Sequence, residues 1–421
     1  MPPVGGPGNH MQDHPLLAHV VLGYSAVIDR QRAVAATRLT IAPESAGADV
    51  DGAALMQLLA EVWPEAAGAQ TLKVPPAHGK AGAAPSAGVS LLVNAAGESL
   101  LRSVLDAPAV PRFMVEVPAF MAADPFVGAS VRALHQAGGS LALKGQPREP
   151  LPDDMAAAFT VQIEDADAPA PKGSALPRLR HGARSAADVD AAFTAGCAAA
   201  AGWPIGEPPK APPPGKAGVA PELQVILELI NRVDREEPVD RLEAVLKNDP
   251  TLAFRLLRYI NSPGFGLSVE IGSFRHALMI LGYQRLKRWL ALLLASASKD
   301  SNMKPVMFAA VRRGLIMEEL VKGSGDAEMR GELFICGVFS LLDRLLKQPF
   351  ADLLRSVPVP DRVRQALLGE QGPFLPYLEL VQAIEQESVI DIREAADRLM
   401  VGLSEVNRAL LAALATAAQL E

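Results

Sequence analysis

The feature that most constrains the fold is residues 248–289, which read NDPTLAFRLLRYINSPGFGLSVEIGSFRHALMILGYQRLKRW. The DP pair at 249–250 can begin a helix, because aspartate accepts N-terminal amides and proline fixes φ at the first helical position. The NSPG run at 261–264 ends that helix, since a residue before proline avoids the α region. Ser273 can begin a second short helix, which ends at Gly282 and is followed directly by a third. This succession predicts a compact all-α core.

This segment resembles an HDOD domain, a relative of the HD phosphohydrolases that is typical of bacterial signalling proteins. The resemblance is carried by DP-x-L, LL-x-x-INSPGFG and I-x-S-x-x-x-AL-x-x-LG before a Trp-bearing helix. Residues 335–374 are also similar to the family, in the variant fused behind an EAL-type domain. The resemblance of both segments implies an all-α HDOD domain over residues 222–421. The candidates for an interaction or structural motif are Asn261, Ser262, Phe265 and Tyr283, which could equally serve turn formation or core packing.

The first half of the chain alternates strands with helices. We expect strands at residues 19–28, 36–42, 90–95, 113–118, 140–145 and 159–163, separated by helices, with a last helix over 187–202. Alternation over roughly 200 residues implies a parallel sheet wrapped by helices, most often a TIM-type barrel. We place this α/β domain at 15–206, between a disordered segment at 1–14 and a Pro-rich linker at 207–221.

This half in turn resembles an EAL domain. The resemblance lies in the order LVN, a strand bearing VEVP, ALHQAGGSLAL and GCAAAAGWPIGEPP. That family hydrolyses cyclic di-GMP on a barrel, with carboxylates that hold divalent metals. The expected architecture is therefore α/β plus all-α, a degenerate EAL-like barrel followed by an all-helical HDOD domain.

The resemblance carries over few of the residues that EAL chemistry needs. Arg38 stands where the glutamate of the Glu-x-Leu motif belongs, and a cation there repels a metal. Asn94 and Glu116 match the family's strand asparagine and its next glutamate, although either could be only a turn or rim residue. The other motif positions read Lys144, Gly145, Gln162, Ala183 and Ala201. We expect neither metal, cofactor nor catalysis in the barrel.

The helical half shows the same loss. An HD site needs adjacent His and Asp with further histidines, whereas Ser340 and Leu341 occupy the matching positions. Asp343 is a single carboxylate, and one carboxylate makes no metal site. His276, the only histidine of this half, is better explained as a packed or surface residue.

The net charge and the cysteines restrict which partners and which cellular compartment we expect for this protein. A formal net charge of −7 argues against broad binding to nucleic acid or anionic membranes. Two cysteines, one in each half, give no disulfide framework, which favours a reducing cytoplasm. The N-terminus does not read as a secretory signal, and the run WLALLLASA is too short to span a bilayer.

We therefore expect a non-catalytic signalling or scaffold protein that acts on unidentified signalling proteins through protein–protein contacts. One alternative is a cyclic di-GMP receptor without hydrolysis, which the lost metal ligands disfavour. Another is a residual metal-dependent phosphodiesterase. A third, nucleic-acid binding by the helix-turn-helix-like run at 273–297, is disfavoured by its few basic residues.

Overall fold

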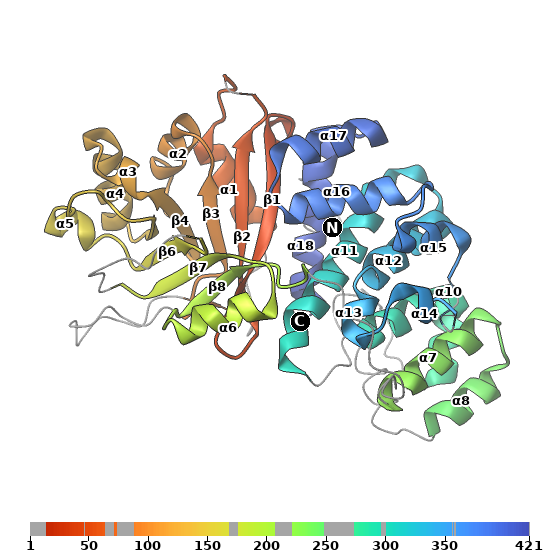
Figure 1. Cartoon of the computed structure of the whole chain (residues 1–421). Helices are drawn as coiled ribbons and strands as arrows, with labels where there is room; N and C mark the ends of the chain where they lie inside the picture. Colours follow the sequence, from red (N-terminus) through yellow and green to blue (C-terminus); the bar gives the residue numbers. More distant parts are fainter. Residues whose placement is uncertain are drawn as a thin grey trace, which may run out of the picture. The chain divides into compact units, whose positions relative to one another are not determined.

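The chain divides into two compact units. The computed structural model describes residues 14–45, 47–63, 71–73, 88–167, 176–206, 221–247, 273–295, 300–355, 357 and 359–420 (Figure 1). Unit 1 comprises Met1–Gly206 with Gln382–Leu411, and unit 2 comprises Glu207–Val381 with Ala412–Glu421. The expected disordered N-terminus at 1–14 and the expected linker at 207–221 lie outside the described residues except for His14 and Pro221, and Pro221 begins a helix.

Unit 1 is built on a closed barrel with the strand order β1-β2-β3-β4-β5-β6-β7-β8. Neighbouring strands from β2 to β8 pair in parallel, as the strand–helix alternation predicts, while β1 is antiparallel to both β2 and β8. The strands are β1 (Val20–Ile28), β2 (Val34–Pro43), β3 (Leu91–Ala95), β4 (Phe113–Pro118), β5 (Ser140–Lys144), β6 (Val161–Asp165), β7 (Arg178–Ala183) and β8 (Ala199–Gly202).

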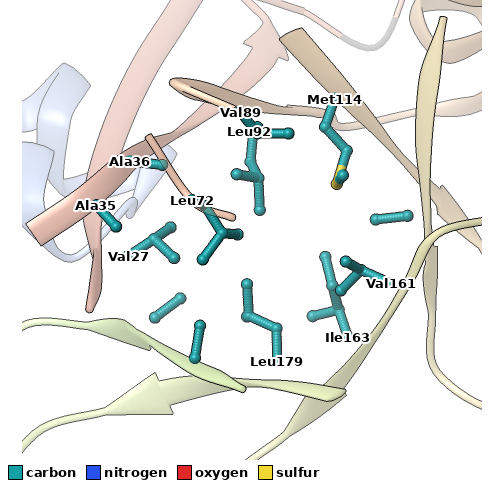
Figure 2. Packing of buried hydrophobic residues seen from close by; sticks show 13 residues of the cluster. Val27, Ala35, Ala36, Leu72, Val89, Leu92, Met114, Val161, Ile163 and Leu179 are labelled. Atoms are coloured by element: carbon teal, nitrogen blue, oxygen red, sulfur yellow. The ribbon is translucent and has the colours of Figure 1, made fainter. Parts of the chain in front are cut away.

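The barrel interior is filled by side chains. Val27, Leu92, Met114, Val161 and Leu179, each from a different strand, point toward one another inside it (Figure 2). Alternate residues of a strand share a face, so these positions identify which side chains along each strand face inward. The interior is thus a packed apolar core, and polar inward-facing residues lie beyond it, toward the carboxyl ends of the parallel strands.

Helices follow most of the strands of unit 1. They are α1 (Gly52–Val62), α2 (Glu98–Leu105), α3 (Ala119–Ala122), α4 (Pro125–Gln136), α5 (Asp153–Ala156) and α6 (Ala186–Thr194), with the 3-10 helix η1 (Pro15–Ala18) before β1. Their starts have local causes. Asp51 and Asp124 accept backbone amides at the N-termini of α1 and α4, and Ser185 forms a capping box at α6.

Two strands differ from the expectation. The helix expected over 187–202 ends at Thr194, and Ala199–Gly202 forms β8, which closes the barrel. The strand β7 was not expected either. Alanine favours helices in isolation, but tertiary pairing with β1 and β7 overrides that preference here.

The segment 382–411 packs on the barrel as part of unit 1. It contains the end of α16 (Leu375–Glu385), all of α17 (Val389–Leu399) and the first half of α18 (Leu403–Leu420). Strand β8 pairs with β1 only along Ala26–Ile28, and the amide of Leu22 beyond that pairing donates instead to Oδ1 of Asn407, at 3.1 Å. The side-chain amide of the fully buried Asn407 donates in return to the carbonyls of Leu17 and Val20. Buried backbone groups need such partners, so Asn407 fixes this segment to β1.

Unit 2 is helical in every part that the structure describes. Its helices are α7 (Pro221–Asp234), α8 (Val239–Lys247), α10 (Phe274–Ala295), η3 (Ser301–Met303), α11 (Lys304–Leu320), η4 (Lys322–Ser324), α12 (Ala327–Phe339), α13 (Leu342–Leu346), α14 (Phe350–Leu353) and α15 (Asp361–Leu368), together with the first part of α16 and the end of α18. As expected, Ser273 accepts from the amide of His276, and the helix breaks at Gly282, where φ is 71°. No single described helix is long and apolar enough to cross a membrane, although the bent pair α17 and α18 passes that test together.

Candidate functional site

Arg38 lies at the centre of a polar cluster at the carboxyl end of the barrel. It shares the inward face of β2 with Ala36, a member of the interior core. Its Nε donates to Oε1 of Glu116 on β4 at 2.6 Å, and its Nη2 donates to Oε2 at 2.9 Å. The two side chains are 1% and 0% exposed. The arrangement is a buried bidentate pair, which commits both carboxylate oxygens of Glu116 to the guanidinium.

A second carboxylate reaches Arg38 from the C-terminal segment. Glu387 lies in the turn between α16 and α17, and its Oε2 accepts from Nη1 of Arg38 at 2.6 Å. The hydroxyl of Thr40 on β2 also donates to Oε2 of Glu387. Residues 349 positions apart in the sequence thus form one ion pair within unit 1.

The two predicted remnant residues both belong to this cluster. Asn94 on β3 donates from its Nδ2 to Oγ1 of Thr40 at 3.0 Å, and Nη1 of Arg38 donates to the same oxygen at 3.1 Å. Thr40 Oγ1 therefore accepts two hydrogen bonds and donates one to Glu387. Asn94 and Glu116 are thus brought together around a cation that the protein itself supplies.

The charge states follow from this pairing. Burial alone would lower the pKa of Arg38, but Glu116 and Glu387 raise it, so the guanidinium stays charged. Burial works against the ionised form of Glu387, yet Arg38 and the Thr40 hydroxyl hold the pKa of this carboxyl below its ordinary 4.5. His181 on β7 has its pKa lowered from 6.5, first by burial and then by the charge of Arg38. The cluster therefore keeps Arg38 and Glu387 in their charged forms.

The other positions that the family resemblance singled out do not complete a metal site. Gln162 does not face the interior, since its neighbours Val161 and Ile163 do, and its side chain donates to the carbonyl of Gly145 at 3.0 Å. It therefore cannot act at the barrel end as the family's strand lysine would. Ala201 lies in the apolar core. Within the described ranges, no group of three or more His, Cys, Asp or Glu side chains could hold a metal ion.

The HD-like position of the helical unit also contacts an arginine. Ser340 ends α12, and its hydroxyl donates to the carbonyl of Gly337 at 2.7 Å and accepts from Nη1 of Arg313 on α11 at 3.0 Å. Asp343 is buried and pairs with the adjacent Arg344 at 2.6 Å. The residues at this position thus form contacts within the protein.

The predicted motif residues of the helical unit are only partly described. Asn261, Ser262 and Phe265 lie outside the described residues. Tyr283 follows the break at Gly282 and donates from its hydroxyl to the carbonyl of Glu237 at 3.0 Å. This contact ties α10 to the segment between α7 and α8.

Sequence reasoning missed three members of the barrel cluster, Thr40, His181 and Glu387. Thr40 and His181 could have been found by extending the inward face of β2 and β7 beyond their apolar residues. Glu387 carries no such local signal, because it follows a helix end in the other half of the chain.

A family model and two curated proteins each match part of this chain. The family model of the HDOD domain matches residues 220–348. An uncharacterized protein, YuxH of Bacillus subtilis, is 30% identical over 41% of this chain and 43% of its own length. The cyclic di-GMP phosphodiesterase CdgJ of Vibrio cholerae is 29% identical over 46% of this chain and 45% of its own length. The chain spans less than half the length of these curated relatives.

Two solved structures resemble the chain weakly. A putative phosphohydrolase from Shewanella amazonensis gives a TM-score of 0.35 at 17% identity, over 51% of this chain and 95% of the other. The phosphodiesterase PaMucR, solved with c-di-GMP, gives a TM-score of 0.29 at 13% identity, over 45% of this chain and 92% of the other. These scores carry no argument about function. The family match does identify the helical region, and residues 220–348 form an HDOD domain on the same chain as a closed eight-stranded barrel.

Proposed function

We propose that the chain is a non-catalytic bacterial signalling protein of the cytoplasm, in which a degenerate EAL-like barrel is joined to an HDOD domain and the two act through protein–protein contacts. The observation that carries the proposal is the buried pair between Arg38 and Glu116. A carboxylate at that end of a barrel could hold a divalent metal, but here both of its oxygens bind a guanidinium.

The free-energy cost of separating Arg38 from Glu116 favours a non-catalytic role over metal-dependent hydrolysis. A divalent cation would have to displace Arg38 from Glu116, and the displaced guanidinium would stay buried beside the new charge. Asn94 donates to Thr40, so it too is engaged within the protein. Arg38 thus supplies the positive charge that a metal would otherwise supply.

Contacts at the HD-like position in unit 2 support the same proposal. Ser340, at the HD-like position, bonds to Arg313, and the nearby Asp343 pairs with Arg344. A metal-dependent phosphohydrolase needs imidazole and carboxylate groups that are free to bind metal. We therefore place the activity of this protein in its contacts with signalling proteins rather than in hydrolysis.

The test is a hydrolysis assay on the full chain with cyclic di-GMP, with Mg²⁺ or Mn²⁺ in excess and the Vibrio cholerae phosphodiesterase relative as the positive control. We expect no turnover above the buffer blank. Titration calorimetry with cyclic di-GMP, with and without Mg²⁺, separates the alternatives. Binding without turnover would favour a nucleotide receptor. Metal-dependent turnover that is lost in Glu116→Gln would overturn the proposal.

A further inference from the structure

The turn that carries Glu387 is shaped to enter the barrel end. Glu387 has φ of 56°, a left-handed conformation that non-glycine residues seldom adopt without support from their surroundings. The backbone of this turn also approaches β1 closely. A Cβ atom on Gly23 would lie 2.7 Å from the Cα of Glu387 and 3.1 Å from the carbonyl oxygen of Ile384. Only glycine at position 23 leaves room for the turn.

The barrel end offers two donors to one carboxylate oxygen. Nη1 of Arg38 and the hydroxyl of Thr40 converge on Oε2 of Glu387. The other guanidinium donors of Arg38, Nε and Nη2, are already taken by Glu116. Arg38 therefore keeps its charge balanced by Glu116 while it presents one remaining edge to a second anion. This is the donor arrangement of a carboxylate-binding site.

We propose that Arg38 and Thr40 form a binding site for a carboxylate, that Glu387 fills it as a ligand tethered to the chain, and that residues 382–411 are a plug that closes the barrel end. The site exists independently of the tether, so it should accept a small free carboxylate when the glutamate side chain is removed. In the intact protein, an anionic ligand reaches Arg38 only after Glu387 has left.

Residues 382–411 are also held on the barrel by contacts other than the ion pair of Glu387. Asn407 bonds to the backbone of η1 and β1 through three hydrogen bonds, and Arg393 on α17 donates to the carbonyl of Glu44 at 2.8 Å. These contacts hold the tethered carboxylate at a high effective concentration over its site. The amide of Leu22 bonds to Asn407, so its hydrogen exchange reports directly whether the plug is seated.

The experiment is hydrogen exchange on the full chain, followed in peptides that contain Leu22 and in peptides from 382–411. In Glu387→Ala, we expect exchange in both to rise about 10- to 100-fold, the loss expected for hydrogen bonds to a charged group. Glu394→Ala is the matched control, because Glu394 is an exposed residue of α17 and its loss should leave exchange unchanged.

Chemical rescue then tests the site itself. Glu387→Ala removes the atoms of one acetate molecule, so sodium acetate should return exchange in the Leu22 peptide toward the wild-type rate, while sodium chloride at equal ionic strength should not. Adding Thr40→Val removes one donor and should weaken the rescue. If Glu387→Ala does not fold, Glu387→Gln keeps the shape without the charge and should show the same rise in exchange. Unchanged exchange in the folded variant, or rescue by chloride as strong as by acetate, would overturn the proposal.

Discussion

The barrel end and the HD-like position at Ser340 each involve an arginine, but the two arginines are held differently. Arg38 is paired with two carboxylates, Glu116 and Glu387. Arg313 donates to a neutral hydroxyl, that of Ser340. The difference teaches that two arginines in one chain can be held by different chemistry. At the barrel end the guanidinium engages both oxygens of a carboxylate, whereas Ser340 engages its arginine through a neutral hydroxyl.

The largest effect should come from reversing the charge at the barrel end. Arg38→Glu places a third carboxylate beside Glu116 and Glu387. Removing one partner of a buried ion pair costs about 3–5 kcal/mol, and we expect the free energy of unfolding to fall by at least that much.

Because three carboxylates then converge, Mg²⁺ or Ca²⁺ should raise the melting temperature of the Arg38→Glu variant and not that of the wild type. Arg148→Glu, at an exposed position, is the control. A variant that stays insensitive to divalent cations would show that the three carboxylates do not converge with the geometry of a metal site.

The hydroxyl in the helical unit should matter less. Ser340→Ala removes the hydrogen bond from Arg313 and leaves a buried Nη1 without that acceptor. The expected loss is about 1–3 kcal/mol in the free energy of unfolding, measured by urea denaturation. A loss as large as that of Arg38→Glu would remove the distinction between the two arginines.

The barrel end should also give the protein a dependence on pH. The folded protein holds the pKa of His181 below 6.5, so as the pH falls through 6.5 the unfolded chain takes up a proton before the folded protein does. Stability is therefore full above that pH and declines below it. The groups that act on His181 are Arg38, Lys144, Glu116 and Glu387, and its Nδ1 lies 3.3 Å from Oδ1 of Asp165.

Comparing the free energy of unfolding of the wild type and His181→Gln from pH 7.5 to pH 5.5 tests this dependence, since the variant should show the shallower decline. His135→Gln on α4 should follow the wild-type curve. Parallel curves for the wild type and His181→Gln would mean that neither burial nor the charge of Arg38 lowers the pKa of this ring.

The smallest effect concerns the two cysteines, one in each unit. Burial, with the nearby carboxylate of Glu164, raises the pKa of Cys197 to about 11, and burial raises the pKa of Cys336 to about 12. Neither thiolate forms at neutral pH, so the native protein should react with a thiol reagent only as fast as it opens. In denaturant, both thiols should react with the reagent rapidly. Fast labelling of one cysteine alone would show that its unit opens independently of the other.

The fold and the site were predictable to different degrees. The apolar periodicity and the breaks gave the strands β1 to β6 and the helix break at Gly282, because those signals are local. The run Ala199–Gly202 was expected to be helical and is a strand, because its conformation depends on neighbours that close the barrel. The resemblance pointed to Arg38, Asn94 and Glu116, which the structure brings together, but Glu387 could only be found in three dimensions.

The sharing of α16 and α18 between the units bears on how the protein can be made and divided. Gln382–Leu411 completes unit 1, although it lies at the far end of the sequence from the barrel strands. Residues 1–206 made alone would leave the amide of Leu22 without Asn407 and Nη1 of Arg38 without Glu387, although Arg38 would keep its pairing with Glu116. On the ribosome, all eight barrel strands are made before the segment 382–411 that completes unit 1. Cutting at the Pro-rich segment therefore yields two incomplete pieces, and the two units are best studied in one polypeptide.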